Sequence, residues 1–244
     1  MTRVSQRFVR SIYVVEDKIP DASRYPFSIP AVRTMGQLDL DAAVTIFVGD
    51  NGSGKSTLIE AIAVAAGFNA EGGSRNFNFK TRGSESELHA CLRLVRGVRR
   101  PRDGFFLRAE SFFNVATEVE NVGAGGSYGG RSLHEQSHGE AFMALAENRF
   151  GDNSLYILDE PEAALSPQRQ LSFLAIIHQL ATNGSQLVMA THSPILMAYP
   201  DAAIYRLDGD GIARVDYEDT EHFQITRSFL TNREIYLRKL LDDK

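Results

Sequence analysis

A glycine-rich turn, placed between a wholly apolar segment and a helix-forming segment, constrains this chain more than any other feature. Residues 49–56 read GDNGSGKS and fit the pattern G-x-x-x-x-G-K-[ST]. The apolar segment before the turn, residues 44–48 (VTIFV), is typical of a strand buried on both faces, and residues 55–66 have the composition of a helix. Because apolar strands alternate with helices along the chain, we expect an α/β fold with a mainly parallel sheet.

The residue types of this turn suit the binding of a nucleoside triphosphate. Glycines let backbone N–H groups point inward, and the N-terminus of the following helix adds positive potential. Lys55 would reach the β- and γ-phosphates, Ser56 would ligate Mg²⁺, and Thr57 would donate to the α-phosphate. A plain glycine-rich turn is the alternative, but the flanking strand and helix argue against it. The expected contacts to the nucleotide come from Gly49, Asn51, Gly52, Ser53, Gly54, Lys55, Ser56 and Thr57.

Two acids follow a second apolar segment, residues 155–158 (LYIL). In an open α/β sheet the carboxyl ends of the strands form the ligand-binding edge, so Asp159 and Glu160 are expected beside the glycine-rich turn. Asp159 would hold Mg²⁺ through a water, and Glu160 would polarise the water that attacks the γ-phosphate. The alternative is a strand that simply ends in a polar turn, and the presence of the phosphate-binding turn makes it less favourable.

A histidine follows the third apolar segment, residues 187–190 (LVMA). A lone histidine at a strand end is usually a surface residue or a satisfied polar group. The order of the three features, each after its own apolar strand, favours instead a sensor of the γ-phosphate at His192.

These segments together resemble the ATP-binding cassette (ABC) ATPases. The resemblance rests on GDNGSGKST, LYILDEPEAALS and THS, and it spans residues 44–208. It implies ATP and Mg²⁺ as cofactors and ATP hydrolysis as the activity, with Lys55, Glu160 and His192 as catalytic residues and Ser56 and Asp159 as metal ligands. It also implies that two copies close head to tail around two ATP molecules.

The signature loop of that family is matched best by residues 136–140 (QSHGE). The resemblance implies that Ser137, Gly139 and Glu140 contact the ATP held by the partner copy, although His138 replaces the first glycine of the usual signature. The family's loop glutamine is missing, and Glu110 or Ser111 would stand in for it. Candidate aromatic contacts for the adenine are Tyr13, Tyr25 and Phe27, each of which is also typical of core or edge packing.

We expect one ABC-type domain over residues 1–244. It would include an antiparallel β portion, a small helical signature subdomain at about 110–150 and C-terminal helices at about 220–244. The remaining expected elements are strands at 8–15, 88–95 and 105–109, helices at 139–150 and from Ser166-Pro167 to Gly184, a hairpin of 203–207 with 212–215, and one or two amphipathic helices at 221–241.

Composition excludes several classes of protein. The 26 basic and 31 acidic residues give a net charge of −5, which argues against a protein that coats DNA by bulk charge. No apolar run is long enough to span a bilayer, so we expect no membrane insertion. The single cysteine, Cys91, excludes an internal disulfide and fits a cytoplasmic location. Five arginines between residues 93 and 102 could bind phosphates, but a solvated strand face is the favoured interpretation.

The helix after the glycine-rich turn reads STLIEAI and looks like that of the SMC and RecF-type cassettes of DNA maintenance. We therefore expect a soluble, stand-alone ABC-class ATPase that forms a homodimer on ATP binding. It would drive a conformational change in an unidentified protein or nucleic-acid partner, with DNA maintenance or defence as candidate processes. The alternative is the ATP-binding subunit of a transporter.

A third class, a zinc peptidase, is suggested by a formal H-E-x-x-H motif at His134, Glu135 and His138. The glycine-rich segment before it, the interruption by Gly139 and the lack of a third ligand at a diagnostic spacing weaken this interpretation.

Overall fold

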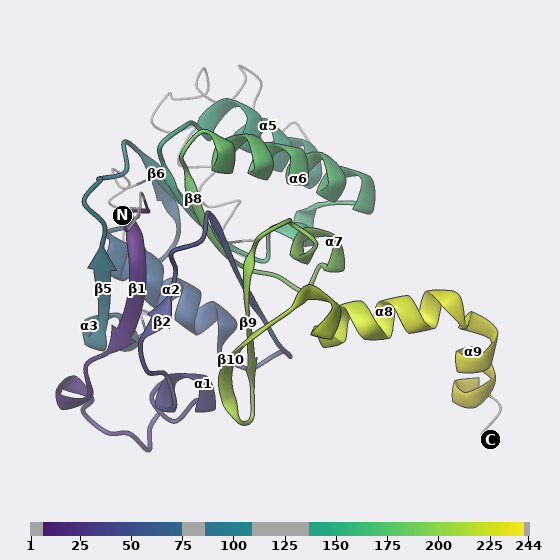
Figure 1. Cartoon of the computed structure of the whole chain (residues 1–244), viewed down its shortest axis with the longest axis horizontal. Helices are drawn as coiled ribbons and strands as arrows, with labels where there is room; N and C mark the ends of the chain where they lie inside the picture. The colour runs from purple at the N-terminus through teal and green to yellow at the C-terminus, as the bar shows by residue number, and fades with distance from the viewer. Residues whose placement is uncertain (1–6, 75–85, 109–136, 242–244) are drawn as a thin grey trace, which may run out of the picture.

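The computed structural model describes residues 7–74, 86–108 and 137–241, and its centre is a seven-stranded sheet (Figure 1). The strand order is β10-β9-β3-β8-β7-β6-β4. The five inner strands run parallel, and β10 and β4 pair antiparallel at the two edges. The strands are β3 (Val44–Val48), β4 (Gly73–Ser74), β6 (Gly104–Arg108), β7 (Leu155–Asp159), β8 (Gln186–Ala190), β9 (Ala203–Asp208) and β10 (Gly211–Val215). The expected mainly parallel α/β sheet is confirmed.

Helices cover both faces of this sheet, which is why β3, β7 and β8 are buried along their whole length. One face packs against α1 (Pro30–Arg33) and α2 (Lys55–Ala66), and α3 (Leu88–Cys91) packs against α2. The other packs against α5 (His138–Arg149), α6 (Pro167–Thr182) and α7 (Pro194–Met197). Alternate strand residues serve the two cores, so that Phe47 faces α2 while Ile46 and Val48 face α6.

A second, antiparallel sheet of order β2-β1-β5 lies over α2 and consists of β1 (Val9–Val14), β2 (Leu38–Asp39) and β5 (Leu92–Arg96). The strand expected at 88–95 was placed wrongly at its start, because Leu88–Cys91 forms helix α3 and β5 begins at Leu92. Leu88 and Cys91 are three positions apart and both buried, and they can face α2 together only on a helix.

The C-terminal part of the chain leaves the body as an arm (Figure 1). The expected hairpin forms from β9 and β10, and the short 3-10 helix η5 (Tyr217–Asp219) leads into α8 (Glu221–Thr231) and α9 (Arg233–Leu241). Neither α8 nor α9 contains a buried residue. The other 3-10 helices are η1 (Glu16–Lys18) and η4 (Pro161–Ala164). In the described part of the chain no helix is long and apolar enough to cross a bilayer.

One buried side chain connects the two sheets. Gln186, at the start of β8, donates from Nε2 to the carbonyl oxygens of Val9 (2.7 Å) and Leu40 (2.8 Å). Its Oε1 accepts from the backbone N–H groups of Phe8 and Val9, each at 3.0 Å. The amide therefore supplies partners to four backbone groups that lie between the sheets, where water does not reach them.

We expect Gln186→Leu to lower the free energy of unfolding by about 4 kcal/mol or more, because it leaves four buried backbone groups without this partner and each unpaired buried polar group costs ~1–3 kcal/mol. Denaturant unfolding followed by circular dichroism measures this loss. The matched control is Gln168→Leu on the exposed first turn of α6, where a change within about 0.5 kcal/mol is expected. Equal losses in the two variants would contradict the role of Gln186.

Candidate active site

The turn between β3 and α2 depends on its glycines. Gly49, Gly52 and Gly54 have φ angles of 147°, 81° and 99°, which L side chains rarely adopt. A Cβ on Gly49 would clash with the backbone oxygen of Leu207, and one on Gly54 would lie 2.8 Å from Cγ2 of Ile29. The backbone can therefore wrap tightly between β9 and α1 and enter α2 with its N–H groups at the sheet edge.

Lys55 is buried beneath this turn. Its ammonium donates to the carbonyl oxygens of Gly49 (2.8 Å) and Asp50 (2.9 Å). Burial lowers the pKa of Lys55, and the carboxylates of Glu160 and Asp159 oppose that shift. Ser53 Oγ is buried without a hydrogen-bond partner in the described residues. A cationic group, an unpaired hydroxyl and the N-terminus of a twelve-residue helix meet here, which fits a polyphosphate.

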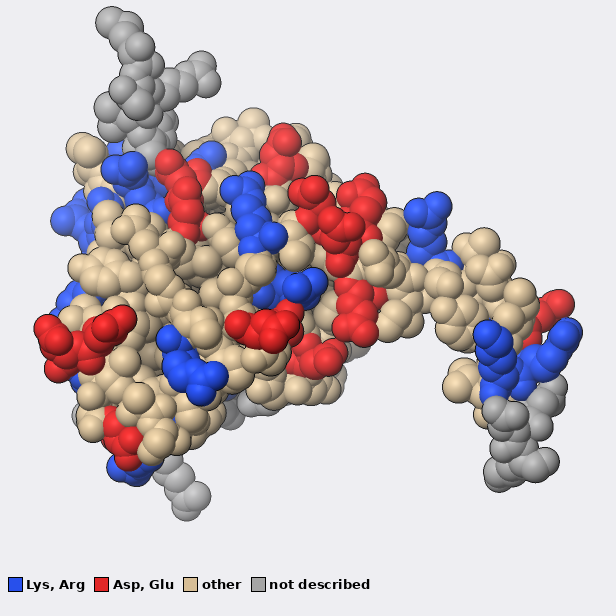
Figure 2. Space-filling view, turned by 60° about the horizontal axis from the view of Figure 1, so that its bottom comes forward, with Lys and Arg blue, Asp and Glu red and all other residues tan. Residues whose placement is uncertain are grey.

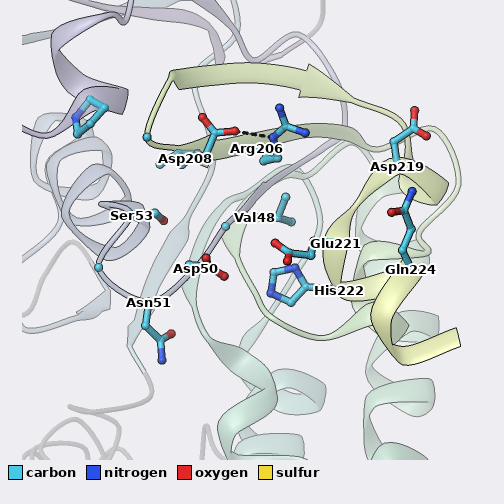
Figure 3. Close-up of a pocket in the computed structure, with 15 residues that line it drawn as sticks. Val48, Asp50, Asn51, Ser53, Arg206, Asp208, Asp219, Glu221, His222 and Gln224 are labelled. Carbon is cyan, nitrogen blue, oxygen red and sulfur yellow. Dashed lines mark hydrogen bonds and ion pairs between the residues drawn. The ribbon is translucent and has the colours of Figure 1, made fainter. Parts of the chain in front are cut away.

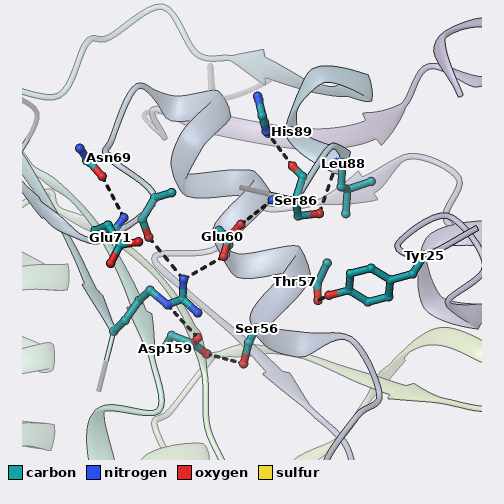
Figure 4. A network of polar contacts seen from close by, with 12 residues as sticks. Tyr25, Ser56, Thr57, Glu60, Asn69, Glu71, Ser86, Leu88, His89 and Asp159 are labelled. Atoms are coloured by element: carbon teal, nitrogen blue, oxygen red, sulfur yellow. Dashed lines mark hydrogen bonds and ion pairs between the residues drawn. The ribbon is translucent and has the colours of Figure 1, made fainter. Parts of the chain in front are cut away.

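The metal-binding pair predicted from the sequence comes together at the same edge. Ser56 Oγ donates to Asp159 Oδ1 at 3.1 Å (Figure 4). Both are hard oxygen donors, as Mg²⁺ prefers, so these two residues fit the ion. Asp159 is buried at the end of β7, one strand away from β8 and two from β3.

Two residues that the sequence analysis missed hold this carboxylate. Arg108 lies in register with Asp159 on the neighbouring strand β6, and its Nε is 4.0 Å from Asp159 Oδ2. Its Nη1 donates to Glu60 Oε2 at 2.8 Å, and Glu60 Oε1 accepts from the backbone of Ser86 at 3.0 Å (Figure 4). The sequence signals were an arginine at the end of an apolar strand and an acid within the apolar helix α2.

Glu160 is held in an unusual backbone conformation. Its φ and ψ angles are 51° and 53°, in the left-handed region that non-glycine residues seldom occupy. Its backbone N–H donates to the carbonyl of Ala190 at the end of β8 (2.9 Å). The side chain borders a cavity of about 390 Å³ that is also lined by Lys55 and Ser56. The strained backbone therefore turns this carboxylate toward the glycine-rich turn.

His192 lies beside Glu160, with its Nε2 3.6 Å from Glu160 Oε1. Its backbone N–H donates to Oε1 of Glu162, whose own pKa is raised by burial. Its Nδ1 is 2.9 Å from Nε2 of His222, a residue that no sequence pattern indicated. Burial lowers the pKa of His192, and the positive charge of Lys55 and the neighbouring His222 lower it further.

A second cavity of about 650 Å³ lies on the other side of the turn, between it and the base of the arm (Figure 3). It shares only part of its wall, Asn51 and Gly52, with the smaller cavity. Four of its lining residues are acidic and one, Arg206, is basic; Arg206 pairs with Asp208 at 2.7 Å. Figure 2 shows basic and acidic side chains interspersed over one face of the molecule, with acidic ones gathered where the arm leaves the body.

The signature residues sit at the start of α5. Ser137 caps that helix, and its backbone N–H and hydroxyl donate to Glu140 Oε2 at 3.0 and 2.7 Å. Arg169 of α6 contacts both residues. A Cβ on Gly139 would lie 2.7 Å from the backbone oxygen of Ala164, so only glycine allows the close approach of α5 to η4. In this copy these residues contact α6 and η4 rather than the glycine-rich turn.

Several predicted residues fall outside the described part of the chain. They are the loop candidates Glu110 and Ser111, the first signature residue Gln136, the glycine-rich segment that precedes the formal zinc motif (residues 123–130), and His134 and Glu135 of that motif. Helix α5 begins at His138, because Ser137 before it has extended backbone angles, with φ −62° and ψ 153°. The described residues also contain no group of three or more His, Cys, Asp or Glu side chains arranged to hold a metal.

The structure distinguishes the three aromatic candidates. Tyr25 is 67% exposed and borders the smaller cavity, and its hydroxyl is 2.8 Å from Thr57 Oγ1 (Figure 4). Phe27 is buried in the core, and Tyr13 pairs with Arg93 on the antiparallel sheet. Tyr25 is therefore the candidate for the adenine contact.

The arginine cluster makes local contacts. Arg93 donates to the backbone oxygens of Ala90 and Leu92, and Arg96 Nη2 donates to Ala65 at 3.1 Å. Arg99 donates to Asn153. These contacts suit a solvated face at the strand end, the interpretation favoured from the sequence.

Two protein families that are described as AAA domains match segments of this chain. The family described as "AAA domain" matches residues 33–117, and the family described as "AAA domain, putative AbiEii toxin, Type IV TA system" matches residues 136–198. The first match contains the glycine-rich turn, and the second contains the acidic pair and His192.

Individual relatives are named as ATP-binding proteins of transport or export systems. The energy-coupling factor transporter ATP-binding protein EcfA2 of Leuconostoc mesenteroides is 26% identical over 71% of this chain and 68% of its own. The cytochrome c biogenesis ATP-binding export protein CcmA of Mesorhizobium japonicum is 28% identical over 65% and 82%. The solved structure of cbiO1 from Clostridium perfringens, part of the ABC transporter complex cbiONQ, matches with a TM-score of 0.50 and 15% identity over 94% and 97%.

We expect Tyr25→Ala to weaken ATP binding about tenfold, because stacking of a base on an aromatic ring contributes ~1–3 kcal/mol. Tyr25→Phe should keep most of the affinity, since it loses only the contact with Thr57. Calorimetric titration with ATP measures both. Tyr13→Ala, on a partly exposed ring of β1, is the control and should bind as the wild type does; a comparable loss there would remove Tyr25 from the site.

Proposed function

We propose that this chain, a P-loop ATPase with AAA-type domains and the fold of ABC ATP-binding subunits, closes as a head-to-tail homodimer on ATP and so changes the conformation of a partner. One observation carries the proposal. The ends of three adjacent parallel strands bring the phosphate-binding turn, the acidic pair and His192 to one edge of the sheet. ATP hydrolysis needs these groups together.

Each residue has a defined task in hydrolysis. Lys55, Ser53 and the amides of the turn bind the phosphates, and Ser56 and Asp159 would hold Mg²⁺, which neutralises phosphate charge when bound. Glu160 positions the attacking water and accepts its proton. His192 donates to the γ-phosphate and senses its loss.

A second copy completes the site in this proposal. Ser137 donates a hydrogen bond to Glu140, and both contact Arg169 of α6 rather than the glycine-rich turn of their own copy. A partner in head-to-tail orientation would present them, with Gly139, to the ATP bound here. Loss of the γ-phosphate would then weaken the contact between copies and let them separate.

We expect Glu160→Gln to bind ATP normally, to hydrolyse it at least a hundredfold more slowly, and to accumulate as a dimer. The amide cannot accept a proton from water, while the phosphate contacts stay intact. Phosphate release measures turnover, and light scattering coupled to gel filtration measures the dimer with and without ATP.

Two further variants serve as controls, one expected to keep turnover and one expected to lose ATP binding. Glu147→Gln, on the exposed face of α5, should retain wild-type turnover. Lys55→Ala should lose ATP binding and remain a monomer. Wild-type turnover in Glu160→Gln would contradict the role of Glu160 in hydrolysis. If the variant hydrolyses ATP slowly but stays a monomer in ATP, only the proposed dimer is contradicted.

The comparisons favour a second candidate, the ATP-binding subunit of a transporter, because the named relatives are transporter and export proteins. The family description that names a toxin of a type IV toxin–antitoxin system is the observation in favour of defence. Purification of Glu160→Gln in ATP from its native cells separates the candidates. An integral membrane protein bound to it supports the transporter, and a nucleic acid or soluble protein supports the first proposal.

A further inference from the structure

A second histidine meets His192 from the base of the arm. His222 Nε2 lies 2.9 Å from His192 Nδ1, although the residues are 30 positions apart in the chain. The ring centroids are 5.1 Å apart and the rings are tilted by 56°. This geometry is a hydrogen bond between ring nitrogens rather than a stack of the two rings.

Both rings are mainly neutral near pH 7. Burial lowers the pKa of each below its usual value of 6.5, and the Lys55 ammonium lowers both further. A hydrogen bond between two neutral imidazoles needs one protonated nitrogen and one lone pair. A single N–H therefore lies between His192 and His222.

The carboxylate of Glu160 decides which ring donates. His192 Nε2 lies 3.6 Å from Glu160 Oε1 and is buried without a hydrogen-bond partner in the residues that the structure describes. A lone pair on that nitrogen would face a negative oxygen, which is unfavourable, whereas an N–H there is attracted to it. The proton of His192 belongs on Nε2, so Nδ1 is the acceptor and His222 Nε2–H is the donor.

The fold holds His222 firmly in this place. Thr220 is buried; its hydroxyl donates to the carbonyl of Tyr217 (2.7 Å) and caps α8 by accepting from Phe223 N (3.4 Å). The Tyr217 hydroxyl donates to the carbonyl of Pro194 at 3.0 Å, two residues beyond His192. The start of α8 is thus tied to the same loop that carries His192. Figure 3 shows the His222 ring close to Asp50 and Glu221 at the wall of the larger cavity.

We propose that His222 is a positioning residue that keeps His192 in the tautomer with its proton on Nε2. The inference rests on the proposed role of His192 as the donor to the γ-phosphate. Because His222 sits in the first turn of α8, a partner that moves the arm would also change the hydrogen-bonding state of His192. The arm is then a route by which a bound partner sets the rate of hydrolysis.

The test compares three variants in steady-state ATPase assays. His222→Leu should lower kcat roughly tenfold with little change in KM, which corresponds to the loss of one hydrogen bond in the transition state. His222→Gln should recover activity to within about threefold, because its amide N–H can reach Nδ1 of His192. His178→Leu, on the exposed face of α6, should behave as the wild type.

Two further measurements separate this inference from the proposed function. Long-range ¹H–¹⁵N spectra should show one His192 tautomer, protonated at Nε2, in the wild type and a mixture in His222→Leu. The double variant His192→Ala/His222→Leu should be no slower than His192→Ala alone. An unchanged tautomer in His222→Leu, or losses that multiply in the double variant, would overturn the positioning role. Wild-type kcat in His192→Ala would overturn the sensor role instead, and the spectra would still decide the positioning.

Discussion

The adjacency of β3, β8 and β7 is the constraint on which the rest of the structure depends. Parallel strands end at the same edge of a sheet, so three loops that follow them must meet. Main-chain pairing from Val44 to Phe47 with β8, and from Leu155 to Asp159 with β8, fixes the register of the three ends. The strands can pair this way because both of their faces are apolar and covered by helices. The chemistry is thus placed by core packing rather than by contacts among the polar residues themselves.

Placement alone does not orient the groups, and the protein adds specific supports behind each of them. The glycines let the turn close against β9 and α1, and the Arg108–Glu60 pair links Asp159 to α2. The left-handed backbone of Glu160 stores strain that its hydrogen bond to Ala190 and the rigid core offset. Such supports reduce the reorganisation that a reaction at this edge requires, because the polar groups are already aimed.

The sequence was sufficient for features whose signal is local. Three wholly apolar segments, each followed by polar residues, predicted the parallel core, and the glycine spacing predicted the turn between β3 and α2. It failed where a tertiary partner determines the outcome. The apolar segment predicted for this strand begins at Leu187, but β8 begins one residue earlier at Gln186, because its amide pairs with backbone groups of Val9 and Leu40 far away in the chain. Arg108 and His222 were missed for the same reason, since neither belongs to a short motif.

The arm formed by α8 and α9 differs from the rest of the molecule, because only its first turn contacts the body near the candidate active site. Along most of α8 and α9 the side chains face solvent, and Leu230 and Leu240 are 72% and 70% exposed. Only the first turn of α8 reaches the catalytic edge, where His222 bonds to His192. In the proposed scheme, a partner that binds the exposed length of α8 acts on the residue beside Glu160 through this first turn, which carries His222.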